Sequence, residues 1–241
     1  MKIIITGCCG FIGYHLAKKL LKSGNTVFGI DNINDYYDKK LKHKRLNNLK
    51  HKNFHFLLDD INSMSNLKGD FNLLINLAAQ PGVRVAREHE NNFFETNIKG
   101  FKNICDYCVS NQIENVIYAS SSSVYEDKTL PFSEKTTALN PKSLYGISKL
   151  VNEKISDMYA SKYDMRFVGL RFFTVYGPYG RPDMAYYLFT KAIQESKQIK
   201  LFNSGKMSRD MTYIDDVVNG IIKTKEYIFN KKLKLNIQFL T

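Results

Sequence analysis

The chain alternates short, continuous apolar runs with longer segments in which apolar side chains recur at helical spacing. The apolar runs lie at residues 2–6, 26–30, 54–58, 73–77, 115–119 and 166–170. The segments of helical period lie at residues 11–21, 91–109 and 144–162. Continuous apolar strands are typical of parallel sheets that are buried on both faces, where the intervening helices supply the cover. The pattern therefore predicts an α/β fold with a doubly wound parallel sheet.

This alternation weakens after residue 170. Residues 172–183 are rich in glycine and proline, which is typical of a loop. Beyond it we expect helices at residues 184–196 and 215–229, and short strands at 199–202, 211–213 and 235–241. We therefore expect one domain over residues 1–171 and a smaller region over residues 172–241. Within that region, a helix near residues 214–229 is expected to pack back on the first domain.

The composition changes this picture little. The 241 residues are 44% hydrophobic and 24% charged, as in most globular proteins. Without an apolar run of about 18 residues, we expect no membrane span. The net charge of +12 raises the question of a nucleic-acid partner, but 28 of the 35 basic residues are lysines. The densest group, at residues 39–45, contains no aromatic residue, so we expect a solvated lysine-rich helix and no nucleic acid.

The four cysteines favour no metal site. Cys8 and Cys9 are adjacent, and Cys105 and Cys108 form a single C-x-x-C without a second pair to complete a zinc site. The first apolar run begins at Lys2, which leaves no room for a signal peptide before it. We therefore expect free thiols and a cytoplasmic protein.

A glycine-rich turn follows the first apolar run. Gly7, Gly10 and Gly13 have the spacing G-x-x-G-x-x-G. The first glycine permits a tight turn, the second lets the backbone approach a pyrophosphate, and the third lets the next helix pack closely on the strand. Free N–H groups at the start of that helix favour phosphate. A strand before the turn and a helix after it favour a dinucleotide site, and hence a Rossmann sheet, over an ordinary turn.

An acidic residue ends the second apolar run. Asp31 lies 18 residues beyond Gly13, where a carboxylate accepts hydrogen bonds from both adenosine ribose hydroxyls and repels a 2′-phosphate. We therefore expect NAD and not NADP, although an aspartate that forms a turn before Asn32 is the simpler alternative. Asp59 and Asp60 end the third run, where one of them could reach the adenine amino group. A turn at the end of the strand explains Asp59 almost as well.

Candidate acid–base chemistry lies further along the chain. Tyr145 and Lys149 form Y-x-x-x-K and share one face of a predicted helix, so the ammonium, together with a cationic nicotinamide, would favour the phenolate. On its own this pair is more often a surface feature. Residues 120–123 are four serines at the carboxyl end of the fifth run, where ligands bind in open α/β sheets. The order of glycine turn, serine and Y-x-x-x-K favours an active site.

Taken together, these motifs resemble those of the extended short-chain dehydrogenase/reductases, and in particular the nucleotide-sugar 4-epimerases. Further matching segments lie at residues 77–80, 96–97, 171–178, 180–184 and 209–216. They closely resemble the UDP-glucuronate 4-epimerase branch, whose members include capsular polysaccharide proteins, over residues 1–237. Glu126 stands where the family has glycine. Family members continue well beyond residue 241, so the resemblance implies a Rossmann sheet with an incomplete small substrate domain and weak activity of this chain alone.

The resemblance also implies roles for individual residues. Tyr145 is the acid–base group, Lys149 binds the nicotinamide ribose and tunes Tyr145, and Ser121 assists at the sugar 4-oxygen. The residues implied to hold NAD, besides Tyr145 and Lys149, are Gly7, Gly10, Phe11, Ile12, Gly13, Asp31, Asp60, Ile61, Leu77, Ala78, Ala79 and Asn97. Those implied to face the UDP-sugar are Arg84, Ser122, Ser123, Thr174, Arg181 and Arg209.

The reaction implied is NAD-dependent 4-epimerisation of a UDP-sugar, with UDP-glucuronate to UDP-galacturonate first, through a 4-keto sugar. UDP-glucose 4-epimerisation is an alternative. Related dehydratases carry Asp-Glu where Ser122 and Ser123 stand, and related decarboxylases carry Glu at Ser123, so both are disfavoured. An inactive NAD-binding module is a further alternative. The family also implies a possible homodimer through the helices at residues 91–109 and 144–162.

Overall fold

The computed structural model describes residues 1–64, 67–83, 87–125, 130–136, 138–199, 201–229 and 237–240. The strands are β1 (Lys2–Thr6), β2 (Thr26–Asp31), β3 (Phe54–Leu58), β4 (Leu73–Asn76), β5 (Asn115–Ser121), β6 (Arg166–Phe172), β7 (Thr174–Tyr176), β8 (Met211–Tyr213) and β9 (Ile237–Leu240). The α-helices are α1 (Phe11–Lys22), α2 (Lys39–Asn47), α3 (Gly100–Ser110), α4 (Leu144–Tyr163), α5 (Ala185–Gln194) and α6 (Ile214–Ile228). The shorter helical turns are η1 (Arg87–His89), η2 (Phe93–Lys99), η3 (Ser122–Val124) and η4 (Phe202–Gly205).

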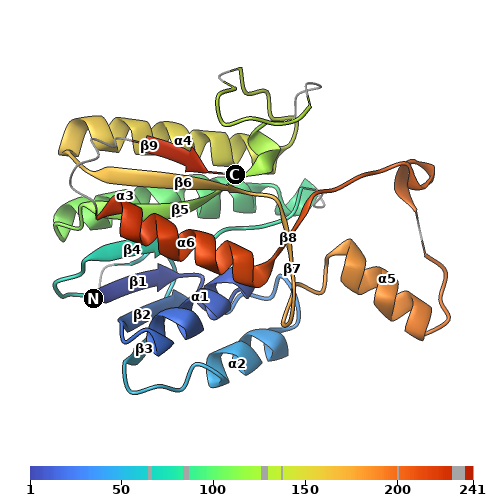
Figure 1. The fold of residues 1–241 in the computed structure, drawn as a ribbon, viewed down its shortest axis with the longest axis horizontal. Coiled ribbons are helices and arrows are strands. Elements are labelled where there is room, and N and C mark those ends of the chain that lie inside the picture. Colours follow the sequence, from blue (N-terminus) through green and yellow to red (C-terminus); the bar gives the residue numbers. More distant parts are fainter. Residues whose placement is uncertain are drawn as a thin grey trace.

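In the part of the chain that the structure describes, the main sheet has seven strands in the order β3-β2-β1-β4-β5-β6-β9, all parallel. Successive side chains of a strand point to opposite faces. Ile3 and Ile5 accordingly pack in one core with residues of α1 and α6, while Ile4 packs in a second core with residues of α3 and α4 (Figure 1). The strands are apolar on both sides for this reason, and the predicted doubly wound sheet is confirmed.

The carboxyl ends of these parallel strands meet at one edge of the sheet, which is where α4 begins. The Ser143 hydroxyl accepts a hydrogen bond from the Gly146 N–H at 3.1 Å and caps the helix. The helix ends at Asp164, whose φ of 51° is left-handed. The cap places Tyr145 in the first turn of α4, and Lys149 one turn further along the helix, beside the end of β5.

Three expectations from the sequence were wrong. Residues 199–202 form no strand where they are described, because residues 202–205 make the turn η4. Residues 172–183 are not all loop, because β7 pairs in parallel with β8, with Thr174 opposite Met211. The helix α2 is not solvated throughout, because the side chains of Lys42 and Arg45 are buried. In the second and third cases, contacts with other segments of the chain decide the structure.

The region after β6 is less compact than the sheet. Helix α5 has no buried residue and lies apart from the sheet in Figure 1, whereas α6 packs against α1 through residues such as Val218 and Ile221. The boundary at residue 171 and a homodimer through α3 and α4 remain predictions. None of the helices that the structure describes combines the length and the apolar character needed to cross a bilayer.

Candidate active site

A cavity of about 350 Å³ opens at the carboxyl edge of the sheet. Most of the predicted site residues line it: Gly7, Gly10, Phe11, Ile12, Gly13, Asp31, Asp60, Ile61, Leu77, Ala78, Ala79, Ser121, Ser122, Ser123, Tyr145, Lys149, Thr174 and Arg181. The fold thus brings together groups from six strand ends and the start of α4. Residues far apart in the sequence meet here because parallel strands all end at the same edge.

Two predicted site residues that the structure describes, Asn97 and Arg209, are not among the residues that line the cavity. The Asn97 side chain is buried, and its amide oxygen accepts the Gln80 N–H at 2.7 Å while its amide nitrogen donates to the Ser148 hydroxyl at 3.0 Å. Asn97 therefore holds the backbone of the loop after β4 at Gln80 without lining the cavity itself. Arg209 is exposed and donates to the neighbouring Ser208 carbonyl. Arg84, like Glu126, lies outside the described residues.

The glycine turn leaves no space for side chains. Gly7 has a φ of 71°, and a Cβ added there would lie 2.8 Å from the Ala78 nitrogen. A Cβ at Gly10 would lie 2.9 Å from the Gly7 carbonyl oxygen, and one at Gly13 only 2.2 Å from the same atom. Only backbone fits between β1, β4 and the start of α1. The N–H groups from Gly7 to Gly10 are bonded within the protein, so the groups suited to a dinucleotide pyrophosphate are those of the first turn of α1, where Phe11 and Ile12 line the cavity.

Asp31 lines the cavity at the end of β2 and is held by two backbone N–H groups. One carboxylate oxygen accepts the Cys9 N–H at 2.9 Å, and the other accepts the Ile33 N–H at 2.8 Å. Each oxygen keeps a further lone pair for a ribose hydroxyl. Asp60 accepts the Asn62 N–H and the Asn32 side chain, so it closes a turn and lines the cavity at once. The geometry is compatible with the predicted contact between Asp60 and an adenine amino group.

Cationic and aromatic groups that the sequence did not single out lie nearby. Tyr36, Tyr37 and Lys42 also line the cavity. The Lys42 ammonium donates to the Asn34 carbonyl at 3.0 Å, and burial lowers its pKa. The fully buried Arg45 donates to the Cys9 carbonyl at 3.0 Å. One signal in the sequence could have indicated a buried role for Arg45. It is the single arginine among lysines, and its guanidinium can donate to two partners at once.

Arg45 and Tyr36 tie the loop after β7 to the segment that follows β2. The Arg45 guanidinium donates to the Tyr179 carbonyl at 2.7 Å. Arg181 makes a two-point ion pair with Asp183, with nitrogen–oxygen distances of 3.0 and 2.5 Å. Asp183 also accepts the Tyr36 hydroxyl at 3.1 Å. Arg181 thereby reaches the cavity as a held cation, near enough to Tyr145 to act on its charge.

Tyr145, Lys149 and Ser121 form the candidate catalytic group. The Lys149 ammonium is 1% exposed, donates to the Ala119 carbonyl at 2.9 Å and lies 5.8 Å from the centre of the Tyr145 ring. Burial lowers the pKa of Lys149 to about 8. Burial also raises the pKa of Tyr145, against the opposing effects of the Arg181 charge and a hydrogen bond with the Ser121 side chain. The expected lowering of the Tyr145 pKa by Lys149 and a nicotinamide remains a prediction.

These features define a dinucleotide-dependent enzyme of the Rossmann class. The model of the NAD dependent epimerase/dehydratase family matches residues 3–237, and the chain belongs to that family. Membership confirms the predicted fold, the enzyme class and the dependence on NAD.

Particular relatives are closely similar. Protein CapI of Staphylococcus aureus is 47% identical over 227 residues, which cover 92% of this chain and 68% of that protein. UDP-glucuronate 4-epimerase 2 of Arabidopsis thaliana is 44% identical, over 92% of this chain and 54% of that protein. The solved structure of UDP-glucuronic acid 4-epimerase from Bacillus cereus, in complex with UDP-glucuronic acid and NAD, superposes with a TM-score of 0.90 at 35% identity. That superposition covers 99% of this chain and 75% of that one.

Proposed function

We propose that this chain catalyses the NAD-dependent epimerisation of UDP-glucuronate at C4, giving UDP-galacturonate. The observation that carries the proposal is a single cavity lined by the glycine turn, by Tyr145 and by Arg181. It combines a phosphate-binding turn, an acid–base group and a guanidinium suited to a carboxylate. The similarity to the Bacillus cereus enzyme, whose structure contains both UDP-glucuronic acid and NAD, supports this choice of substrate.

The residues present fit NAD. The turn at Gly7, Gly10 and Gly13 would take the pyrophosphate, and Asp31 the adenosine ribose. Lys149 would donate to the nicotinamide ribose. When bound, NAD supplies the hydride acceptor, and afterwards the hydride donor, at C4 of the sugar. The remaining chemistry is positioning and proton transfer by side chains of this chain.

Tyr145, as the phenolate, would take the proton from the sugar 4-hydroxyl and later return it to the 4-oxygen. Ser121, which hydrogen-bonds Tyr145, would hold the same oxygen. The 4-keto sugar has to turn between the two half-reactions, so that the hydride returns to its other face. Arg181 would hold the carboxylate through a two-point contact, at the expense of part of its pairing with Asp183.

The proposal is tested by incubating the chain with NAD and UDP-glucuronate and separating the products by anion-exchange chromatography. UDP-galacturonate should form, and the mixture should reach the same equilibrium from either sugar. UDP-glucose is the comparison substrate. Conversion of UDP-glucose in preference to UDP-glucuronate would instead support the UDP-glucose 4-epimerase, and formation of a dehydrated or decarboxylated product would refute epimerisation.

Arg181→Gln should reduce kcat/KM for UDP-glucuronate by about 10- to 100-fold, because a charged hydrogen-bonding partner of the carboxylate is lost. Any turnover of UDP-glucose, which lacks the carboxylate, should change much less. Initial rates with both substrates measure the difference. The matched control is Arg166→Gln at the opposite end of β6, where the arginine pairs with the exposed Glu114 at 3.2 Å. Equal losses for both substrates would exclude recognition of the carboxylate by Arg181.

Asp31→Ala should weaken NAD binding by about tenfold or more, since hydrogen bonds to a charged acceptor are lost. It should also relax the discrimination against NADP, because the carboxylate that repels the 2′-phosphate is gone. Isothermal titration calorimetry with each nucleotide measures both effects. Asp216→Ala, an exposed aspartate in the first turn of α6, is the control. NADP binding as tight as NAD binding in the unaltered protein would contradict the prediction.

A further inference from the structure

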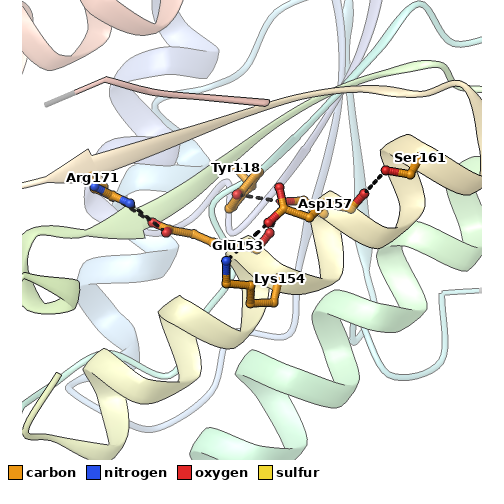
Figure 2. A network of polar contacts seen from close by, with 7 residues as sticks. Tyr118, Glu153, Lys154, Asp157, Ser161 and Arg171 are labelled. Carbon is orange, nitrogen blue, oxygen red and sulfur yellow. Dashed lines mark hydrogen bonds and ion pairs between the residues drawn. The ribbon is translucent and has the colours of Figure 1, made fainter. Parts of the chain in front are cut away.

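A buried ion pair lies directly behind the catalytic group. The Arg171 guanidinium donates to both oxygens of Glu153, each at 2.9 Å, and both side chains are only 2% exposed. Figure 2 shows Arg171, at the end of β6, pointing toward Glu153 in the middle of α4. The Ser120 hydroxyl also donates to Glu153, at 2.6 Å. One carboxylate therefore connects α4 with the carboxyl ends of β5 and β6.

The catalytic residues lie on two of these three elements, each next to a member of the connection. Ser121 follows Ser120 in β5, and Lys149 precedes Glu153 by one turn of α4. Ser120 and Arg171 are direct neighbours in the β5–β6 register. Since Lys149 also donates to the Ala119 carbonyl, the last residues of β5 touch α4 at successive positions.

The other side of Arg171 contacts the turn that carries the substrate-facing serines. Its guanidinium lies 4.7 Å from the centre of the buried Tyr125 ring, directly after η3. The Ser121 hydroxyl in turn accepts the Ser123 N–H at 3.1 Å. The position of the whole segment from Ala119 to Tyr125 thus depends on contacts with α4 and Arg171.

Stability alone does not account for such a pair. Replacing a buried ion pair by apolar residues of similar volume is often neutral or stabilising, whereas removing one partner is strongly destabilising. What apolar residues would not reproduce is the fixed two-point geometry between helix and strand. We infer that Glu153 and Arg171 are positioning residues, which hold the carboxyl end of β5 against α4 and thereby set Ser121 relative to Tyr145 and Lys149. The inference rests on the proposed function for its effect on turnover.

The double variant Glu153→Leu/Arg171→Met tests it, because it removes the pair without leaving an unpaired charge or changing the net charge. Its melting temperature should stay near that of the unaltered protein, while kcat for UDP-glucuronate should fall about 100-fold, as expected for a displacement of order 1 Å. The control is Lys154→Gln/Asp157→Asn, which removes an exposed pair on the same helix, 3.6 Å apart (Figure 2). This control should leave kcat unchanged.

A second measurement does not depend on substrate or cofactor. The pKa of Lys149 is obtained from the pH dependence of its acetylation by a small anhydride, followed by mass spectrometry. It should lie near 8 in the unaltered protein and should rise toward the ordinary lysine value of about 10.4 in the double variant, as a loosened strand end admits water. The change in the Lys149 pKa tests the positioning role even if UDP-glucuronate is not the substrate. Whether UDP-glucuronate is the substrate is measured separately, with the unaltered protein.

Arg171→Lys is the second variant, in case the double variant does not fold. It keeps the charge but loses the fork that binds both carboxylate oxygens. The Lys149 pKa should again rise, and kcat should fall by a smaller factor than in the double variant. A folded variant of either kind that keeps both the kcat and the Lys149 pKa of the unaltered protein would overturn the inference, and the pair would then be purely structural.

Discussion

Tyr145→Phe is expected to lower the turnover of UDP-glucuronate by about 10²–10⁴-fold, the usual contribution of a general acid–base group. The phenylalanine ring keeps the packing of the first turn of α4 but can neither take nor return the proton of the 4-hydroxyl. Affinity for NAD should change little, because the glycine turn and Asp31 are untouched. Steady-state rates by product chromatography, together with calorimetric titration of NAD, measure the two quantities separately.

The matched control for this substitution is Tyr163→Phe, at the other end of the same helix. Tyr163 is 40% exposed and its ring packs at a tilt against that of Tyr159, and it is not among the residues that line the cavity. Loss of its hydroxyl should leave kcat unchanged. If Tyr145→Phe keeps the turnover of the unaltered protein, another group performs the proton transfer and the assignment from the Y-x-x-x-K spacing is wrong.

The sequence predicts those parts of the site whose residues lie close together in the chain. The three glycines of the turn lie within seven residues, and Tyr145 and Lys149 are one helical turn apart, so each motif specifies its own geometry. The alternation of apolar runs and helices then predicts which ends of the strands meet. Together these signals are sufficient to predict that Ser121 lies near Tyr145.

The parts that the sequence does not predict depend on partners far away in the chain. Arg45 reaches the Tyr179 carbonyl across 134 residues, and β7 becomes a strand only because β8 pairs with it. Glu153 belongs to no motif, and the matching segment 171–178 does not indicate that Arg171 pairs with Glu153; burial of both charges follows from the packing of α4 on the sheet. The spacing of residues in the sequence does not indicate such long-range contacts. For this reason the lysine-rich helix α2 was expected to be solvated, although contacts with other segments bury Lys42 and Arg45.

The tightest steric requirement in the cofactor site is at Gly13, and Gly13→Ala should therefore have a large effect for a change of one methyl group. The added Cβ would lie 2.2 Å from the Gly7 carbonyl oxygen and 2.9 Å from its carbonyl carbon. These are backbone atoms, so the clash is relieved only if the turn moves away from α1. Overpacking of this kind costs about 1–3 kcal/mol or more. The N–H groups that should receive the pyrophosphate move with the turn.

We expect Gly13→Ala to lower the melting temperature and to weaken NAD binding by about tenfold or more, since each 1.4 kcal/mol of lost binding energy is a factor of ten. Thermal unfolding with and without NAD, followed by calorimetry, separates the two effects. Gly220→Ala is the control: this glycine lies within α6, and a Cβ there meets nothing within 4 Å. Removing backbone freedom in a helix should stabilise the control by about 0.5–1 kcal/mol. Unchanged NAD affinity in Gly13→Ala would show that the turn tolerates the methyl group and that close contact between Gly7 and Gly13 is not required for the cofactor.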